Sequence, residues 1–252
     1  MNNRLNELTK NLARLITCGG ALKELGVGLA GISLLCLSLM NTAEAQTSVV
    51  CDPSGDAAYS NGKGGPQVPK WLDLVEGTIT DAGENILFTL TVNAPIPLRP
   101  NWNNADDGGQ FWWSWRLIGD INDLTFVSNG CLQSKGQNVP AVYCLDLIWN
   151  VQAANFCARL LDDTTCTETA IPFVFSTDRR EVSMLVSKSL FTNTVLIPDP
   201  NSFQFLMETF VWKAGSNGNK SLTILDNAPT QTGAGFRLGT WTSSSNNAYD
   251  CP

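Results

Sequence analysis

Short segments in which every second residue is apolar recur along the chain, and this period of two constrains the fold more than any other feature. Residues 86–92 read Ile-Leu-Phe-Thr-Leu-Thr-Val, so alternate side chains, all apolar, lie on one face of a strand. In residues 111–118, Trp113 and Trp115 lie on one face of the strand, and Trp112, Ser114 and Arg116 lie on the other. A helix has a period of 3.6 residues, so the pattern predicts β-strands.

Turn-forming residues separate eight or nine such segments from residue 71 onward. The other predicted strands are residues 72–79, 143–151, 156–161, 171–175, 181–187, 203–212 and 236–241. The segment at 181–187 could also begin a helix with Asp178 and Glu181 as a capping box, but its alternation favours a strand. The pattern predicts an all-β fold, a two-sheet antiparallel β-sandwich of jelly-roll type, with residues 46–70 as an extended lead-in.

Residues 1–45 have the layout of a secretory signal peptide. Four basic residues and an apolar run over residues 25–40 precede Ala43-Glu44-Ala45, which predicts cleavage before Gln46. The apolar run is about sixteen residues long, shorter than the roughly twenty that cross a bilayer. We therefore expect residues 46–252 to form a single mature domain that is secreted or periplasmic and has no membrane span.

The mature sequence is acidic and contains no histidine. Of the 16 basic and 23 acidic residues in the chain, 12 and 20 follow residue 45, which gives a net charge of −8. Such a surface repels phosphate groups, which argues against nucleic acid and anionic membranes as partners. The absence of histidine excludes Ser-His-Asp and Cys-His catalysis and every histidine-ligated metal site.

Six cysteines follow residue 45, and an even number in an exported chain indicates three disulfides. Fifteen pairings are possible. The spacing favours two short loops and one link between the ends of the domain: Cys131–Cys144, Cys157–Cys166 and Cys51–Cys251. No pair has the Cys-x-x-Cys spacing of a zinc site, so disulfides are preferred to metal binding.

Several short motifs lie in a characteristic order. The first motif is Asp52-Pro53-Ser54-Gly55-Asp56, and it is followed by the Asp-Leu pair at residues 73–74. A Pro-rich turn and an aromatic strand come next. The last motif, near the end of the chain, is Asp226-Asn227-Ala228-Pro229. Over residues 51–230 the chain resembles exported bacterial β-sandwich domains related to DOMON domains and family-nine carbohydrate-binding modules. The resemblance implies a β-sandwich and, among its members, either sugar or haem binding. Histidine-ligated haem is not expected here, because the chain has no histidine.

Four aspartates form the candidate metal site: Asp52, Asp56, Asp73 and Asp226. The Gly-Asp turn brings Asp52 and Asp56 close together, and a sandwich could bring the other two nearby. Hard cations bind several carboxylate and carbonyl oxygens, so the set predicts a structural Ca²⁺. The alternative is that Asp and Gly only favour turns.

Tryptophans provide the candidate ligand surface, because aromatic faces stack on sugar rings. Trp113 and Trp115 are expected in the core. Trp102, in a polar loop, and Trp112, on the opposite strand face, are the candidate platforms. The expected hydrogen-bonding partners for sugar hydroxyls are Asn103, Asn104, Asp106 and Arg116. The alternative is that both candidate rings pack under a loop.

These features predict a secreted, non-catalytic binding module, with carbohydrate as the ligand class and Ca²⁺ as a possible cofactor. The first alternative is a structural or adhesive extracellular protein with protein partners. The second is a carboxylate-dependent hydrolase, although no motif singles out a catalytic pair among the twenty acidic residues.

Overall fold

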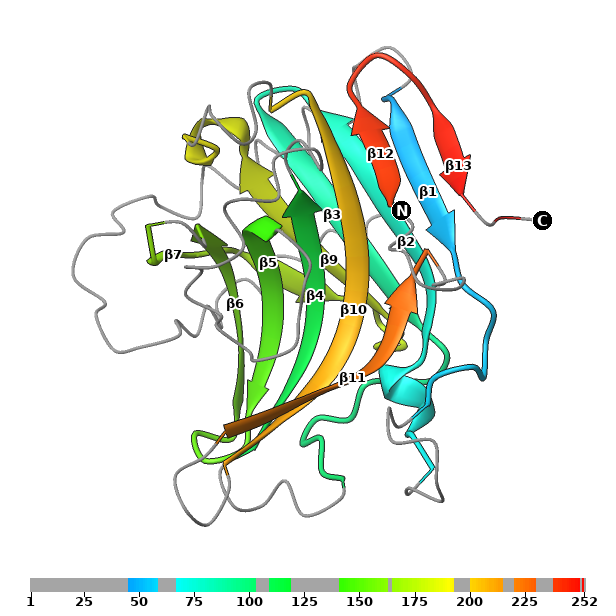
Figure 1. Cartoon of the computed structure of the whole chain (residues 1–252), viewed down its shortest axis with the longest axis vertical. Helices are drawn as coiled ribbons and strands as arrows, with labels where there is room; N and C mark the ends of the chain where they lie inside the picture. The colour runs from blue at the N-terminus through cyan, green and yellow to red at the C-terminus, as the bar shows by residue number, and fades with distance from the viewer. Residues whose placement is uncertain are drawn as a thin grey trace.

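Two largely antiparallel sheets face each other in the computed structural model of the chain (Figure 1). The structure describes residues 45–58, 67–102, 109–118, 141–162, 165–192, 200–214, 220–229, 238–249 and 251. One sheet has the strand order β13-β1-β2-β3-β9-β8, and the other has the order β11-β10-β4-β5-β6-β7 with β12 also paired to β10. Within these residues, no helix is long and apolar enough to cross a membrane.

Thirteen strands and two short 3-10 helices make up the described elements. The six-stranded sheet contains β1 (Thr47–Cys51), β2 (Leu74–Ala82), β3 (Asn85–Val92), β8 (Phe173–Phe175), β9 (Glu181–Ser187) and β13 (Asn247–Tyr249). The seven-stranded sheet contains β4 (Gln110–Ile118), β5 (Ala141–Asn150), β6 (Asn155–Asp162), β7 (Thr167–Ala170), β10 (Ser202–Ala214), β11 (Lys220–Ala228) and β12 (Gly239–Thr242). The 3-10 helices η1 (Lys70–Leu72) and η4 (Lys188–Leu190) precede β2 and follow β9.

The all-β sandwich predicted from the alternation is confirmed. The clearest predicted strand, residues 86–92, lies within β3 and buries every second side chain. The segment at 181–187 is strand β9 and not a helix. The lead-in prediction is only partly right, because β1 begins at Thr47 and pairs antiparallel with β2. The predicted signal peptide, except for Ala45, lies outside the described residues.

The two sheets approach closely at one glycine of β2. Gly77 lies against Met207 of β10 and Trp115 of β4, and a Cβ atom at residue 77 would overlap both side chains. Trp115 also packs edge-on against Phe88 of β3, and both rings are fully buried. The core therefore lies between the sheets, where the alternation placed Trp113 and Trp115.

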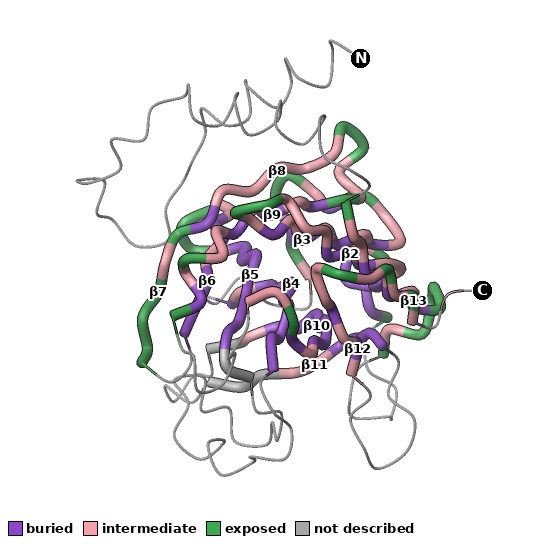
Figure 2. The backbone as a smooth tube through the Cα atoms, turned by 90° about the horizontal axis from the view of Figure 1, so that it is seen from above, coloured by how far each residue is buried: buried purple, intermediate pink, exposed green. Residues whose placement is uncertain are grey.

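Strand β4 is buried on both of its faces. Trp112, Ser114 and Arg116 point away from the core between the sheets, yet each is at most 3% exposed. Figure 2 shows buried residues along the central strands and exposed ones along edge strand β7 and in several turns. A second apolar cluster lies on this outer face and joins Trp112 to Phe210 and their neighbours.

The structure confirms one of the three predicted disulfides and contradicts the other two. The Cys51–Cys251 bond is present and joins residues separated by 200 positions. The Cys131–Cys144 pair is wrong, because Cys144 is a buried thiol that takes part in no disulfide and that the strand register places opposite Arg116. Cys131 itself lies outside the described residues.

Cys157 and Cys166 each take part in a disulfide, and the strand register places them too far apart to be paired with each other. The register pairs Asp162 with Thr167, so Cys166 lies beside the far end of β6. Asp162 lies five positions after Cys157 in β6, which corresponds to a rise of roughly 16 Å. Because the Cα atoms of a disulfide lie within about 7 Å of each other, the predicted pairing of these two cysteines is wrong.

Candidate functional site

Three of the four predicted metal ligands meet at one end of the sandwich. Asp52 and Asp56 belong to the segment that follows β1, and Asp226 lies near the end of β11. One carboxylate oxygen from each lies within 4.8 Å of the others. Asp52 and Asp226 are buried, whereas Asp56 is exposed, so the cluster has one ligand at the protein surface and two beneath it.

A β-bulge helps to aim Asp226 into this cluster. In the pairing of β10 with β11, Thr209 lies opposite Asp226 and Phe210 lies opposite Ile224, so Leu225 is the extra residue. Bulges change the direction of the side chains beside them. The Asp226 carboxylate then accepts hydrogen bonds from the backbone N–H of Leu74, at 2.6 Å, and of Asn227, at 2.9 Å.

Asp73, the fourth predicted ligand, borders the cluster. Its Oδ2 atom accepts hydrogen bonds from the Gly55 N–H at 2.8 Å and from Asn93 Nδ2 at 2.6 Å. Gly55 adopts a φ of 93°, which only glycine takes without strain. Asp73 is 2% exposed, and its Oδ1 atom has no hydrogen-bond partner in the described part of the chain. A buried acceptor without a partner destabilises the fold by about 1–3 kcal/mol, so this oxygen is available to a ligand.

Burial and repulsion between neighbouring carboxylates raise the pKa values of Asp226 and Asp56. The pKa of Asp226 is raised to about 9. Burial of its carboxyl group is the largest cause, and repulsion from Asp52, Asp56 and Asp73 adds to it. The hydrogen bond from the Leu74 N–H acts in the opposite direction. The pKa of Asp56 is also raised, first by burial and then by Asp73. A bound cation would reverse both effects, because it stabilises the ionised carboxylates.

The donor chemistry of the cluster suits a hard cation. All four side chains offer carboxylate oxygens, and the described cluster contains neither a thiol nor an imidazole. Ca²⁺ takes six to eight oxygen ligands in flexible geometry, whereas zinc sites use mainly nitrogen and sulfur. The residues therefore fit Ca²⁺ with backbone carbonyls or water completing the ligand set.

The predicted ligand surface is arranged differently from the prediction. Trp112 is 1% exposed and donates its Nε1–H to Gln110 Oε1 at 3.0 Å. Its ring stacks on Phe210 with centroids 5.0 Å apart, and the Arg159 guanidinium lies 4.9 Å from the ring centroid. The indole is therefore engaged by protein side chains and is not a surface platform in this structure.

Arg116 is buried beside Trp112 on the same strand face. Its Nε–H donates to Glu208 at 3.0 Å and its Nη1–H to the Cys144 sulfur at 2.7 Å. Burial lowers the pKa of Arg116, but the charges on Cys144, Glu208 and Asp146 outweigh burial and raise it. Arg116 thus forms an ion pair inside the protein instead of offering hydrogen bonds at the surface.

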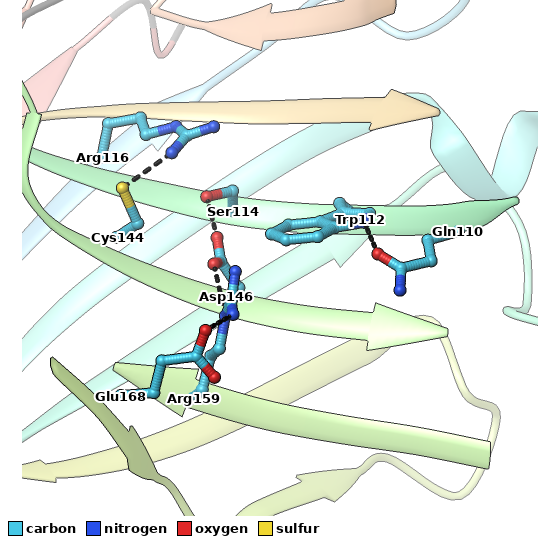
Figure 3. A network of polar contacts seen from close by, with 8 residues as sticks. All are labelled: Gln110, Trp112, Ser114, Arg116, Cys144, Asp146, Arg159 and Glu168. Carbon is cyan, nitrogen blue, oxygen red and sulfur yellow. Dashed lines mark hydrogen bonds and ion pairs between the residues drawn. The ribbon is translucent and has the colours of Figure 1, made fainter. Parts of the chain in front are cut away.

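A row of polar side chains crosses the seven-stranded sheet next to Arg116 (Figure 3). Glu208, Ser114, Asp146 and Arg159 lie opposite one another on four neighbouring strands. Ser114 Oγ–H donates to Asp146 at 2.6 Å, and Arg159 Nε–H donates to the other Asp146 oxygen at 3.2 Å. Arg159 also forms an ion pair with Glu168. The contacts bind the strands together and leave the arginine charges compensated.

Trp102 is the one remaining predicted ligand residue that the structure describes. Trp102 is half-buried and packs against the main core, whereas Trp112 belongs to the cluster on the outer face. The structure therefore does not bring the two rings together. Asn103, Asn104 and Asp106 lie outside the described residues, so their role in a ligand surface stays a prediction.

Comparison of the chain with protein-family models gave no match, and comparison with curated protein sequences gave none either. The resemblance to DOMON domains and family-nine carbohydrate-binding modules therefore stays a prediction. The fold and the geometry of the acidic cluster are the grounds on which function can be argued.

Proposed function

We propose that this protein is a secreted, non-catalytic binding module whose β-sandwich holds Ca²⁺ at Asp52, Asp56, Asp73 and Asp226. The observation that carries the proposal is the approach of three carboxylates, from both ends of the domain, to within 4.8 Å. Like charges this close destabilise the fold unless protons or a cation neutralise them. The buried Oδ1 atom of Asp73 supports the same reading independently.

Carbohydrate is the ligand class that we propose for the module. Trp102 supports this choice because its side chain is only partly buried. In the sequence it also directly precedes the polar segment that contains Asn103, Asn104 and Asp106. An aromatic face beside amide and carboxylate groups suits a sugar ring and its hydroxyls. Trp112 and Arg116 are buried and engaged by protein side chains, so in this proposal they do not touch the sugar.

The cation proposal is tested by thermal unfolding of protein purified from the exported fraction, in EDTA and in millimolar Ca²⁺ or Mg²⁺. A ligand present at one hundred times its Kd stabilises the folded state by about 2.7 kcal/mol, or roughly 5–11 °C for a domain of this size. We expect this shift with Ca²⁺. The same melting temperature in EDTA and in Ca²⁺ would contradict the proposal.

Two variants locate the site and separate it from general charge effects. Asp56→Asn, at the exposed ligand, should remove most of the Ca²⁺-induced shift. Glu84→Gln is the matched control, because it also removes one negative charge but lies in the exposed turn between β2 and β3. A glycan panel probed with and without Ca²⁺ then tests the ligand class, and Trp102→Ala should abolish any binding while the domain still folds, with some loss of melting temperature because the ring packs against the core.

A further inference from the structure

We infer that the Cys51–Cys251 disulfide and the cation site are coupled. Breaking the disulfide weakens cation binding, and a bound cation protects the disulfide from reduction. The inference rests on the proposed Ca²⁺ site and adds a redox dependence to it. It follows from the position of the disulfide relative to the segment that carries two of the four aspartates.

The disulfide closes one end of a parallel strand pair. Strands β1 and β13 run side by side in the same direction, with Val50 opposite Tyr249 (Figure 1). Cys51 is the last residue of β1, and Cys251 follows β13 by two residues. The bond therefore fixes the point at which the chain leaves the sheet and enters the acidic segment.

Asp52 directly follows Cys51, so the acidic segment begins at this covalent anchor. The anchor is supplemented by three hydrogen bonds of 2.8 Å along residues 52–58. They join the Asp52 N–H to Val75 O, the Gly55 N–H to Asp73 Oδ2 and the Ala58 N–H to Leu225 O. One of these bonds depends on a carboxylate of the site itself. Release of Cys51 therefore weakens the head of the segment without removing all of its support.

Electrostatic repulsion gives the segment a reason to move once it is released. Asp52 and Asp56 lie against Asp226, and without a cation any two of these carboxyl groups that are ionised repel each other. The disulfide opposes that repulsion by holding Cys51 beside the end of β13. In the disulfide-free protein the cation must also reorder the released backbone, and ordering about one residue corresponds to roughly tenfold in affinity.

Reduction follows ordinary thiol–disulfide exchange. A dithiol reductant breaks the S–S bond, both protein sulfurs become thiols, and the reductant becomes a disulfide. Thermodynamic linkage is reciprocal, so a tenfold loss of cation affinity on reduction requires that the cation stabilise the disulfide by the same factor. For this two-electron couple, tenfold corresponds to a shift of about 30 mV in reduction potential.

The first experiment measures Ca²⁺ affinity by calorimetry in the native oxidised protein and in the Cys51→Ser/Cys251→Ser double variant. We expect the double variant to bind about tenfold more weakly, with an unchanged far-UV spectrum. Tyr249→Phe is the matched control. It removes the hydrogen bond from Tyr249 Oη–H to Thr240 O, and so loosens β13, but it leaves the disulfide intact.

The second experiment needs no variant. The native protein is pulsed with dithiothreitol in Ca²⁺ or in EDTA and alkylated, and each cysteine is then quantified by mass spectrometry. Ca²⁺ should slow the labelling of Cys51 and Cys251. Cys157 and Cys166 serve as internal controls, because both are disulfide-bonded and neither belongs to the acidic cluster.

The outcomes separate the coupling from the proposed site. If the native oxidised protein binds no Ca²⁺, the proposed function fails and the coupling fails with it. If it binds Ca²⁺ but the double variant binds equally well, the site stands and the coupling is refuted. If the double variant does not fold, the labelling experiment decides, and equal protection of Cys51 in Ca²⁺ and EDTA refutes the coupling.

Discussion

The acidic cluster should make the stability of the cation-free protein fall as pH rises. Asp226 has a pKa of about 9 in the folded chain against an ordinary value of 3.8. Between these values the folded state binds more protons at this site than the unfolded state does. Stability is therefore highest at or below the ordinary pKa and decreases as pH rises toward 9. This direction is opposite to that of an aspartate in a salt bridge, whose pKa is lowered.

The size of the effect follows from the shift in pKa. Each unit of pH between the two pKa values changes the free energy of unfolding by about 1.4 kcal/mol. From pH 5 to pH 7, Asp226 alone should therefore lower the stability of the cation-free protein by about 3 kcal/mol. With Ca²⁺ present the trend should reverse, because protons compete with the cation for the same carboxylates.

The assay is urea unfolding in EDTA at several pH values, comparing the native chain with Asp226→Asn. The variant has no proton to lose at residue 226, so the difference between the two curves isolates this residue from the other titrating groups. The single side-chain oxygen of an asparagine can replace only one of the two Asp226 oxygens that accept backbone hydrogen bonds. This loss lowers the free energy of unfolding of the variant by the same amount at every pH. The comparison is therefore between the slopes of the free energy of unfolding against pH. Glu84→Gln should retain the native slope. Parallel curves for the native chain and Asp226→Asn would refute the argument.

Two further predictions concern packing and buried charge. Gly77→Ala should destabilise the domain by about 1–3 kcal/mol in urea unfolding, because the added methyl group overlaps Met207 and Trp115 between the sheets; a change within about 0.5 kcal/mol would mean that the sheets separate freely. Arg116→Met should cost about 3–5 kcal/mol, because it leaves the Glu208 carboxylate buried without its ion-pair partner, and Arg116→Met/Glu208→Leu should recover most of that loss. Equal stability of the single and double variants would show that the unpaired charge is not the cause.

Much of the fold was predictable because local alternation decides which residues face the core. The hairpin of β2 and β3 has a glycine with a φ of 72° at its turn, at Gly83, and both strands are recognisable from residue type. Strands β1, β7, β11 and β13 were not predicted. Of these, β7 and β13 have only four and three residues, and β13 gains its place by pairing with β1 near the opposite end of the sequence. Such pairing leaves no periodic pattern in a segment of three or four residues.

The candidate cation site was predictable in membership but not in geometry. Aspartate next to glycine identified Asp52 and Asp56, and two short motifs, the Asp-Leu pair at residues 73–74 and Asp226-Asn227-Ala228-Pro229, supplied the other two aspartates. The orientation of Asp226 depends on the extra residue Leu225 opposite a neighbouring strand, which is a property of the register and not of the local sequence. The segment order therefore predicted a cluster, whereas the bulge determines which oxygens meet.

The polar row beside Trp112 shows where reasoning from alternation stops. Alternation correctly placed Trp112 and Arg116 opposite the core residues of β4, but a face opposite one core can itself be buried. A signal was present in the sequence, since Asp146, Arg159 and Glu208 interrupt otherwise apolar strands at the alternate positions. Buried charges cost desolvation and persist only when paired, so charged residues at matching positions on several apolar strands predict mutual ion pairs better than they predict an exposed binding surface.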